Sequence, residues 1–79
     1  MIFVDKNKTP ERTVFYMAAV LSHLIHEESK ISYEALYQKA INIVPYRATF
    51  SQDYILALDF LFIVGIIDVD DKGFLNAIN

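Results

Sequence analysis

The chain has 79 residues, of which 54% are hydrophobic, with no cysteine and a net charge of −3. Disulfides are thereby excluded, and the Lys and Arg side chains are scattered along the chain rather than clustered as in a phosphate-binding surface. This length predicts a single domain, residues 1–79, and a domain of this size buries only about 60–65% of its unfolded surface. Packing, within the chain or across an interface, must therefore supply the stability.

The first residues show no secretory signal. Met1-Ile2-Phe3-Val4 are followed at once by Asp5 and Lys6, without the apolar region that such a signal requires. Residues 2–4 themselves suit a brief strand or an arm lying on the core. We therefore expect a cytoplasmic protein, and the lack of cysteine is compatible with that compartment.

A first helix is predicted from about residue 10 to residue 28. Thr9-Pro10-Glu11 provide a cap, a proline at the first helical position and an acid near the positive end of the helix dipole. Apolar residues then recur at helical spacing: Val14, Met17, Ala18, Leu21, Leu24 and Ile25. One face of this helix should therefore pack against the core.

A second helix is predicted to begin near Ser32, which is a suitable cap with Glu34 behind it. Ile31, just before it, could form a strand of a single residue. Pro45 ends this helix, because it lacks an amide donor and pushes the preceding residue towards an extended conformation. The inner face of the helix is expected to comprise Leu36, Tyr37, Ala40, Ile41 and Val44.

A third helix is predicted from a cap at Ser51 to Val64, with Gly65 ending it. Residues 54–67 are apolar almost all the way round, and a small domain cannot cover such a helix by itself. The segment is too short for a membrane span and carries Asp59 near its middle. Asp59 either faces solvent as a break in the apolar stripe or is a buried acid beside a hydrogen-bond donor. Part of this surface is expected to contact a partner.

The pattern changes to strands after the third helix. Residues 66–69 and 74–78 are strand-like, and Asp70-Asp71-Lys72-Gly73 between them form a turn with glycine where a positive φ is needed. Helix, short strand, helix, helix and hairpin is the order of a winged helix-turn-helix. The sequence therefore predicts an α+β fold, a small winged-helix domain with three helices and a C-terminal β-hairpin.

A winged helix that binds DNA through its third helix needs basic or amide side chains on that helix. The predicted third helix offers Gln52, Asp53 and Asp59 but no Lys or Arg, and the hairpin carries three acids against one lysine. These acids would repel DNA, so we expect no direct binding to nucleic acid through this surface. The alternative function, a small DNA-binding transcriptional regulator, would use three phosphate contacts: Lys39, Arg47 and Lys72.

His23, His26 and Glu27 are the one group that resembles a metal or acid–base site. Their spacing matches neither HExxH nor HxxEH, and zinc would need further ligands. The simpler interpretation is that both histidines complement the dipole at the C-terminal end of the first helix. The chain also lacks a GxSxG serine motif and a phosphate-binding GxxxxGKS/T motif. We therefore expect no metal, no cofactor and no enzymatic activity.

Aromatic residues are numerous for so small a core, and tyrosine is enriched at interface hot spots. Some of them must fill the domain itself. On a helix, Phe60 and Phe62 point about 200° apart, so both sides of the third helix need cover. The residues predicted to lie in a protein interface are Tyr54, Leu58, Phe60, Phe62, Tyr16 and Tyr46.

Three stretches resemble a known family. They are KTPERTVFY (8–16), ISYEALY (31–37) and above all LALDFLFIVGIID (56–68), which is followed by DKG (71–73). Over nearly its whole length the chain is similar to the small middle components of bacterial ABC-three component systems, particularly the group called middle component 6. The motifs are apolar patterns rather than catalytic residues.

The resemblance implies a winged-helix accessory protein encoded beside an SMC-like or RecN-like ABC ATPase and a third, larger component, in systems associated with defence against phages and plasmids. The family has no catalytic residues to transfer onto this sequence. By analogy with the winged-helix subunits of condensin-like complexes, such a component would bridge other subunits and could form a homodimer. The expected function is therefore a non-catalytic adaptor that mediates protein–protein assembly.

Overall fold

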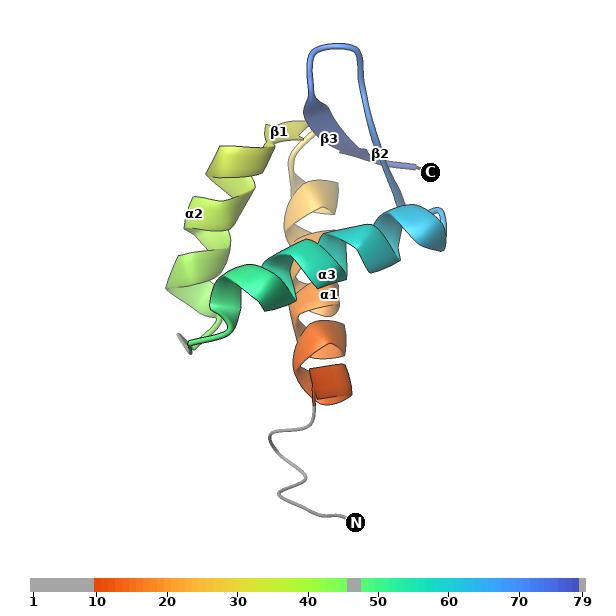
Figure 1. The fold of residues 1–79 in the computed structure, drawn as a ribbon. Coiled ribbons are helices and arrows are strands. Elements are labelled where there is room, and N and C mark those ends of the chain that lie inside the picture. Colours follow the sequence, from red (N-terminus) through yellow and green to blue (C-terminus); the bar gives the residue numbers. More distant parts are fainter. Residues whose placement is uncertain (1–9, 46–47, 79) are drawn as a thin grey trace.

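A computed structural model describes residues 10–45 and 48–78. Helix α3 lies across α1, with α2 beside them and the sheet at one end (Figure 1). This arrangement confirms the predicted α+β class, and the order of its elements is compatible with a winged helix. The elements are α1 (Pro10–Glu27), β1 (Ile31–Ser32), α2 (Tyr33–Ile43), α3 (Phe50–Ile63), β2 (Ile67–Val69) and β3 (Phe74–Ala77). The strand or arm predicted at residues 2–4 lies outside the described residues.

The ends of α2 follow the predicted capping chemistry. The hydroxyl of Ser32 accepts a hydrogen bond from the backbone N–H of Ala35 at 3.1 Å, which satisfies one of the free donors of the first turn. At the other end Val44 is extended, with φ −90° and ψ 130°, as a residue before proline prefers.

The start of α3 differs from the prediction. The helix begins at Phe50, so Thr49 rather than Ser51 occupies the cap position, and no side chain caps the helix. The Thr49 hydroxyl instead donates to the carboxylate of Asp53 at 3.0 Å, and the Ser51 hydroxyl is hydrogen-bonded to the Tyr37 hydroxyl at 2.9 Å. The predicted cap position was therefore wrong by two residues. The Ser51 hydroxyl cannot cap the helix because it bonds to the side chain of Tyr37.

The end of α3 was predicted correctly. Gly65 has a φ of +82°, and its N–H donates to the Phe62 carbonyl at 3.1 Å. The next N–H, that of Ile66, donates to the Leu61 carbonyl at 2.9 Å. These two bonds form a Schellman motif, which needs a left-handed residue at the position that Gly65 holds.

The three strands form an antiparallel sheet in the order β1-β3-β2. Ile31, the predicted lone strand residue, pairs with Leu75. The turn between β2 and β3 contains Gly73 at a φ of +89°, which confirms the predicted hairpin. Asp70 holds this turn together: its Oδ1 accepts from the N–H groups of Lys72 and Phe74, both at 2.9 Å.

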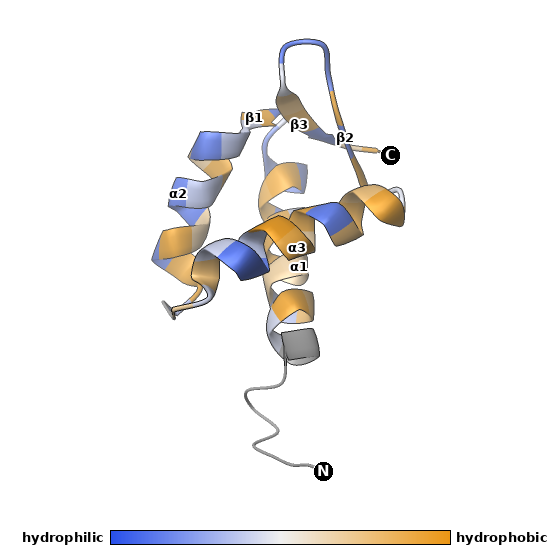
Figure 2. Ribbon diagram, in the orientation of Figure 1, coloured by the Kyte–Doolittle hydropathy of each residue, from blue (hydrophilic) through white to orange (hydrophobic). Residues whose placement is uncertain are grey.

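One apolar core lies where the three helices and the sheet meet, and α3 contributes much of it (Figure 2). Tyr54 is completely buried, and its hydroxyl donates to the Tyr33 carbonyl at 2.7 Å. Its ring makes edge contacts with the rings of Tyr33 and Tyr37. Tyr54 and Leu58, which is also buried, are therefore core residues, although both were predicted to lie in an interface.

Replacing Tyr54 with Phe should lower the free energy of unfolding by about 1 kcal/mol, because a buried hydrogen bond is lost while the ring contacts remain. Urea unfolding of the two proteins at neutral pH, followed by circular dichroism, measures this difference. A variant as stable as the wild type would show that the hydrogen bond does not contribute.

The same pair of proteins should differ in alkaline solution. Burial raises the pKa of Tyr54 above its ordinary value of 10.0, and the nearby Tyr33, Glu34 and Tyr37 add to this effect. The folded state therefore retains the proton more tightly than the unfolded chain does. Above about pH 10 the wild type should lose stability relative to Tyr54→Phe, by at most about 1.4 kcal/mol per pH unit. Unfolding curves between about pH 8 and about pH 11 test this.

Candidate functional site

An apolar stripe runs along the solvent-facing side of α3. The opposite side is buried and comprises Phe50, Asp53, Tyr54, Ala57, Leu58 and Leu61. The stripe consists of four side chains that lie on one helical face and are exposed by between 37% and 82%: Ile55, Leu56, Phe62 and Ile63. We call these four residues the α3 stripe.

Asp59 lies in the middle of the α3 stripe and is exposed. Of the two alternatives that the sequence left open, the structure therefore shows a solvent-facing break. The buried acid of this helix is Asp53, which is only 6% exposed and accepts the Thr49 hydroxyl bond. The sequence did not reveal that Asp53 is buried and Asp59 exposed. A signal was present, because Gln52 and Asp59 are seven residues apart and therefore lie on the same, solvent-facing side of the helix.

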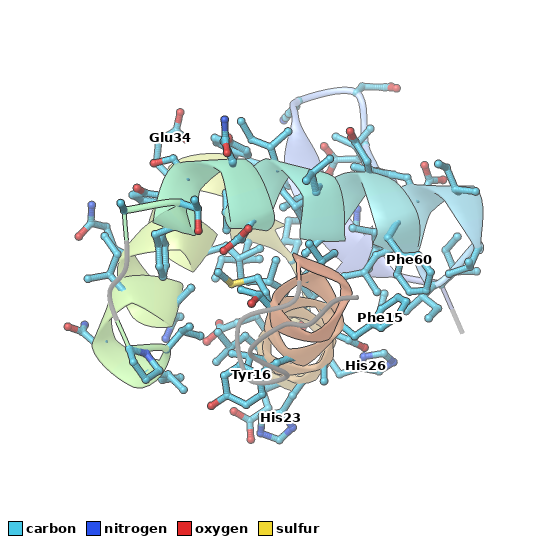
Figure 3. All side chains as sticks on the ribbon, turned by 60° about the horizontal axis from the view of Figure 1, so that its bottom comes forward. Phe15, Tyr16, His23, His26, Glu34 and Phe60 are labelled. Carbon is cyan, nitrogen blue, oxygen red and sulfur yellow. The ribbon has the colours of Figure 1, made fainter. Side chains whose placement is uncertain are left out.

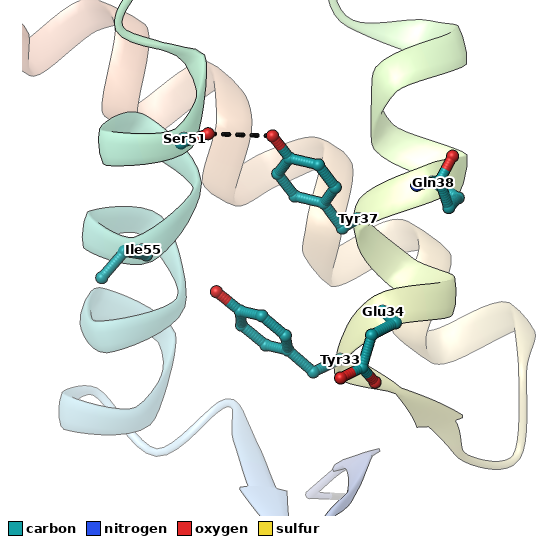
Figure 4. A pocket seen from close by; sticks show the side chains of 6 residues that line it. All are labelled: Tyr33, Glu34, Tyr37, Gln38, Ser51 and Ile55. Atoms are coloured by element: carbon teal, nitrogen blue, oxygen red, sulfur yellow. Dashed lines mark hydrogen bonds between the residues drawn. The ribbon is translucent and has the colours of Figure 1, made fainter.

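Two hollows adjoin the α3 stripe. The first, between α2 and the start of α3, has a volume of about 250 Å³ (Figure 4). Its lining consists of Tyr33, Glu34, Tyr37, Gln38, Ser51 and Ile55. The second, between α3 and the hairpin, has a volume of about 380 Å³. Its lining consists of Tyr33, Ile55, Leu58, Asp59, Phe62, Val69, Gly73 and Leu75. Both linings include Tyr33 and Ile55, so the two hollows adjoin each other.

Aromatic rings form the wall of the first hollow. Tyr33 and Tyr37 project from α2 towards α3, where the Tyr37 hydroxyl reaches Ser51 (Figure 4). Behind them Tyr54 touches both rings with centroid distances of 5.2 and 4.8 Å, and Phe50 lies 5.4 Å from Tyr37. Because Tyr54 and Phe50 are buried, the core holds the two lining tyrosines in position.

The remaining predicted interface residues do not lie together. Phe62 belongs to the α3 stripe, whereas Phe60 is half-buried and packs edge-on against Phe15, with ring centroids 5.4 Å apart. Tyr16 is exposed on the side of α1 that faces away from α3, near His23 (Figure 3). Tyr46 lies outside the described residues.

The predicted phosphate contacts do not form a basic surface within the described part of the chain. Lys39, on α2, is 3.4 Å from the carboxylate of Glu28, and Lys72 lies in the acidic hairpin turn. Arg47 lies outside the described residues. Helix α3 presents the apolar stripe and Asp59 where a DNA-binding winged helix would present basic side chains.

The histidines of α1 make local contacts. The His23 Nε2 lies 3.3 Å from the carboxylate of Glu27, and the His26 Nδ1 donates to the Ser22 carbonyl at 2.8 Å. Within residues 10–45 and 48–78, no three His, Asp or Glu side chains lie close enough together to hold a metal ion.

A small α+β protein that leaves an apolar helix face exposed has the surface of a subunit of a larger assembly. The model of the family described as ABC-three component (ABC-3C) system Middle Component 6 matches residues 4–77, so the chain belongs to that family. This confirms the family resemblance, and a middle component of a multi-component system implies protein partners. Neither a curated protein nor a solved structure matches the chain.

In the described part of the chain, no helix is both long and apolar enough to cross a membrane.

The β2–β3 hairpin, which lines one side of the second hollow, should become less stable in acid. The hydrogen bond from the N–H of Phe74 is the largest cause that lowers the pKa of Asp70 below its ordinary value of 3.8. Desolvation, the next largest, opposes it, and the N–H of Lys72 and the ammonium of Lys30 lower the pKa further. The stabilisation that Asp70 gives the hairpin is therefore present above about pH 4 and lost as the pH falls through the lowered pKa.

This prediction is tested by following the amide resonances of Lys72 and Phe74 by NMR as the pH is lowered. They should shift with a midpoint below 3.8 in the wild type, and Asp70→Asn should remove that transition. A midpoint at or above the ordinary value would contradict the assignment.

Proposed function

We propose that this chain is a non-catalytic adaptor of an ABC-three component system, which assembles with an SMC-like ABC ATPase and a further, larger component. Family membership supports a place in such a system. In this proposal the system defends a bacterium against phages and plasmids, and the chain contributes to assembly rather than to chemistry.

The α3 stripe is the observation on which the proposal rests. Ile63 is 82% exposed, and Leu56 and Ile55 are about half exposed. A partner that buried one such side chain would gain about 1–2 kcal/mol from the hydrophobic effect. Several adjacent apolar side chains around one acid resemble the centre of a protein interface more than a surface that stays in water.

Replacing Phe62 or Ile63 with Asp should weaken assembly with the other two components by about 30-fold, because a buried interface would then contain an unpaired charge. Both positions are on the α3 stripe and exposed, so the variants should remain folded. Co-purification of the tagged chain after co-expression with the two components measures the effect.

Tyr16→Asp is the matched control, since Tyr16 is 51% exposed but lies on the far side of α1. It should co-purify as the wild type does. Equal recovery of the Phe62 and Ile63 variants would contradict docking through α3. A wild-type chain that binds only itself, as measured by light scattering, would indicate a homodimer instead of an adaptor.

The alternative function, a DNA-binding regulator, is favoured by the order of elements alone. Lys39 is already paired with Glu28, and the exposed side of α3 is apolar and acidic. We therefore expect no shift of duplex DNA in an electrophoretic mobility assay even at low salt, where phosphate contacts are strongest. Binding that weakens steeply with added salt, and that Lys39→Ala and Lys72→Ala reduce, would support the regulator.

A further inference from the structure

The two hollows beside the α3 stripe adjoin each other and have mainly apolar walls, and together we call them the groove. Tyr33 and Ile55 line both the part beside α2 and the part beside the hairpin. Leu58 and Leu75 contribute buried side chains to the second part, and Phe62 lines it from the stripe. The groove therefore offers contacts for apolar side chains along α3, from Ser51 to Phe62.

The charges that line this groove are of one sign. Glu34 lines the first hollow and Asp59 the second, and the described lining residues include no Lys or Arg. Within the part of the chain that the structure describes, neither carboxylate forms an ion pair or accepts a hydrogen bond. We call this surface, with its two acids, the acidic groove.

Four other acids of the described residues are already engaged. Asp70 lies 3.3 Å from the Lys30 ammonium, and Glu28 lies 3.4 Å from that of Lys39. Asp53 accepts the Thr49 hydroxyl bond, and Asp68 accepts one from the backbone of the next residue. The acids of the groove thus retain their full capacity to pair with a cation that another molecule supplies.

The aromatic lining favours the same kind of occupant. Tyr33 is 42% exposed, and Tyr33, Glu34 and Tyr37 line the first hollow together from α2 (Figure 4). An ammonium or guanidinium group is attracted by aromatic faces as well as by a carboxylate. The first hollow therefore combines two features that stabilise a Lys or Arg side chain.

A partner could instead add a strand to the edge of the sheet at β2, but this edge is poorly suited to it. Strand β2 lies at the edge of the sheet and has only three residues. The N–H of Val69 on this strand already donates to the Asp68 carboxylate at 2.8 Å. A short edge strand with an occupied donor disfavours pairing with another strand, so side chains must provide the contacts.

We propose that the acidic groove binds a basic amphipathic segment of one of the other two components, with its apolar side chains between α3 and the hairpin and its Lys or Arg side chains beside Glu34 and Asp59. The inference rests on the proposed function and identifies the chemistry of the partner. Because the acids attract a cationic segment and repel acidic ones, they give the groove specificity that its apolar walls alone would lack.

The test uses overlapping synthetic peptides that cover both other components, probed with the labelled full chain. Peptides that bind should combine apolar residues with Lys or Arg. The double variant Glu34→Lys, Asp59→Lys should weaken their binding by about tenfold or more, and the neutral variant Glu34→Gln, Asp59→Asn should fall between it and the wild type. Asp71→Lys, an exposed acid outside the groove lining, is the matched control and should bind as the wild type does.

Glu34 also lies in the first turn of α2, where an acid favours the helix, so each variant is checked by thermal unfolding before binding is compared. Bound peptides that are neutral or acidic, or equal binding by the double variant, would overturn the inference. The inference would also be overturned if charge reversal changed the oligomeric state of the chain in the absence of the other components. The occupant of the groove would then be a second copy of the chain.

Co-purification of the full-length components separates this inference from the proposed function. Phe62→Asp could abolish assembly while charge reversal at Glu34 and Asp59 leaves it intact. That result would refute the acidic groove and support docking through α3. Failure of the wild-type chain to assemble with either component would refute both.

Discussion

Tyr54 lies inside the core and donates a hydrogen bond to the carbonyl of Tyr33, the first residue of α2. This bond joins the start of one helix to the middle of another across the interior. The ring of Tyr54 also supports the rings of Tyr33 and Tyr37 from behind. Tyr54 thus joins α2 to α3 at the first hollow, together with the Tyr37–Ser51 hydrogen bond and the contact between the rings of Tyr37 and Phe50.

The position of Tyr54 also determines which side of α3 remains exposed. Once Tyr54, Leu58 and Leu61 face the core, the helical period places Ile55, Phe62 and Ile63 on the opposite side. The elements formed by residues 10–45 and 48–78 leave a second side of the same helix uncovered. The exposed stripe is thus a consequence of a nearly uniformly apolar helix in a very small domain.

Local signals made most of the fold predictable. Ser32, Pro45, Gly65 and Gly73 act on the backbone next to them, and each ends or begins an element where the sequence indicated. The start of α3 was not predictable in this way, because Thr49 and Ser51 bond to side chains whose positions are set by tertiary packing. The candidate site was predicted only in part for the same reason. Composition showed that α3 had surplus apolar surface, but only the packing of its neighbours decides that Tyr54 is covered and Phe62 exposed.

Acids beside an exposed apolar surface serve two physical purposes at once. Asp59 interrupts the α3 stripe, so that a second copy docking on the same face would bring like charges together. The same charge, with Glu34, lowers the free energy of a complex whose partner supplies Lys or Arg. An apolar surface alone would attract any other apolar surface, including its own copy. The combination of apolar walls and unpaired acids is therefore better suited to one basic partner than to self-association or to DNA, whose phosphates these acids repel.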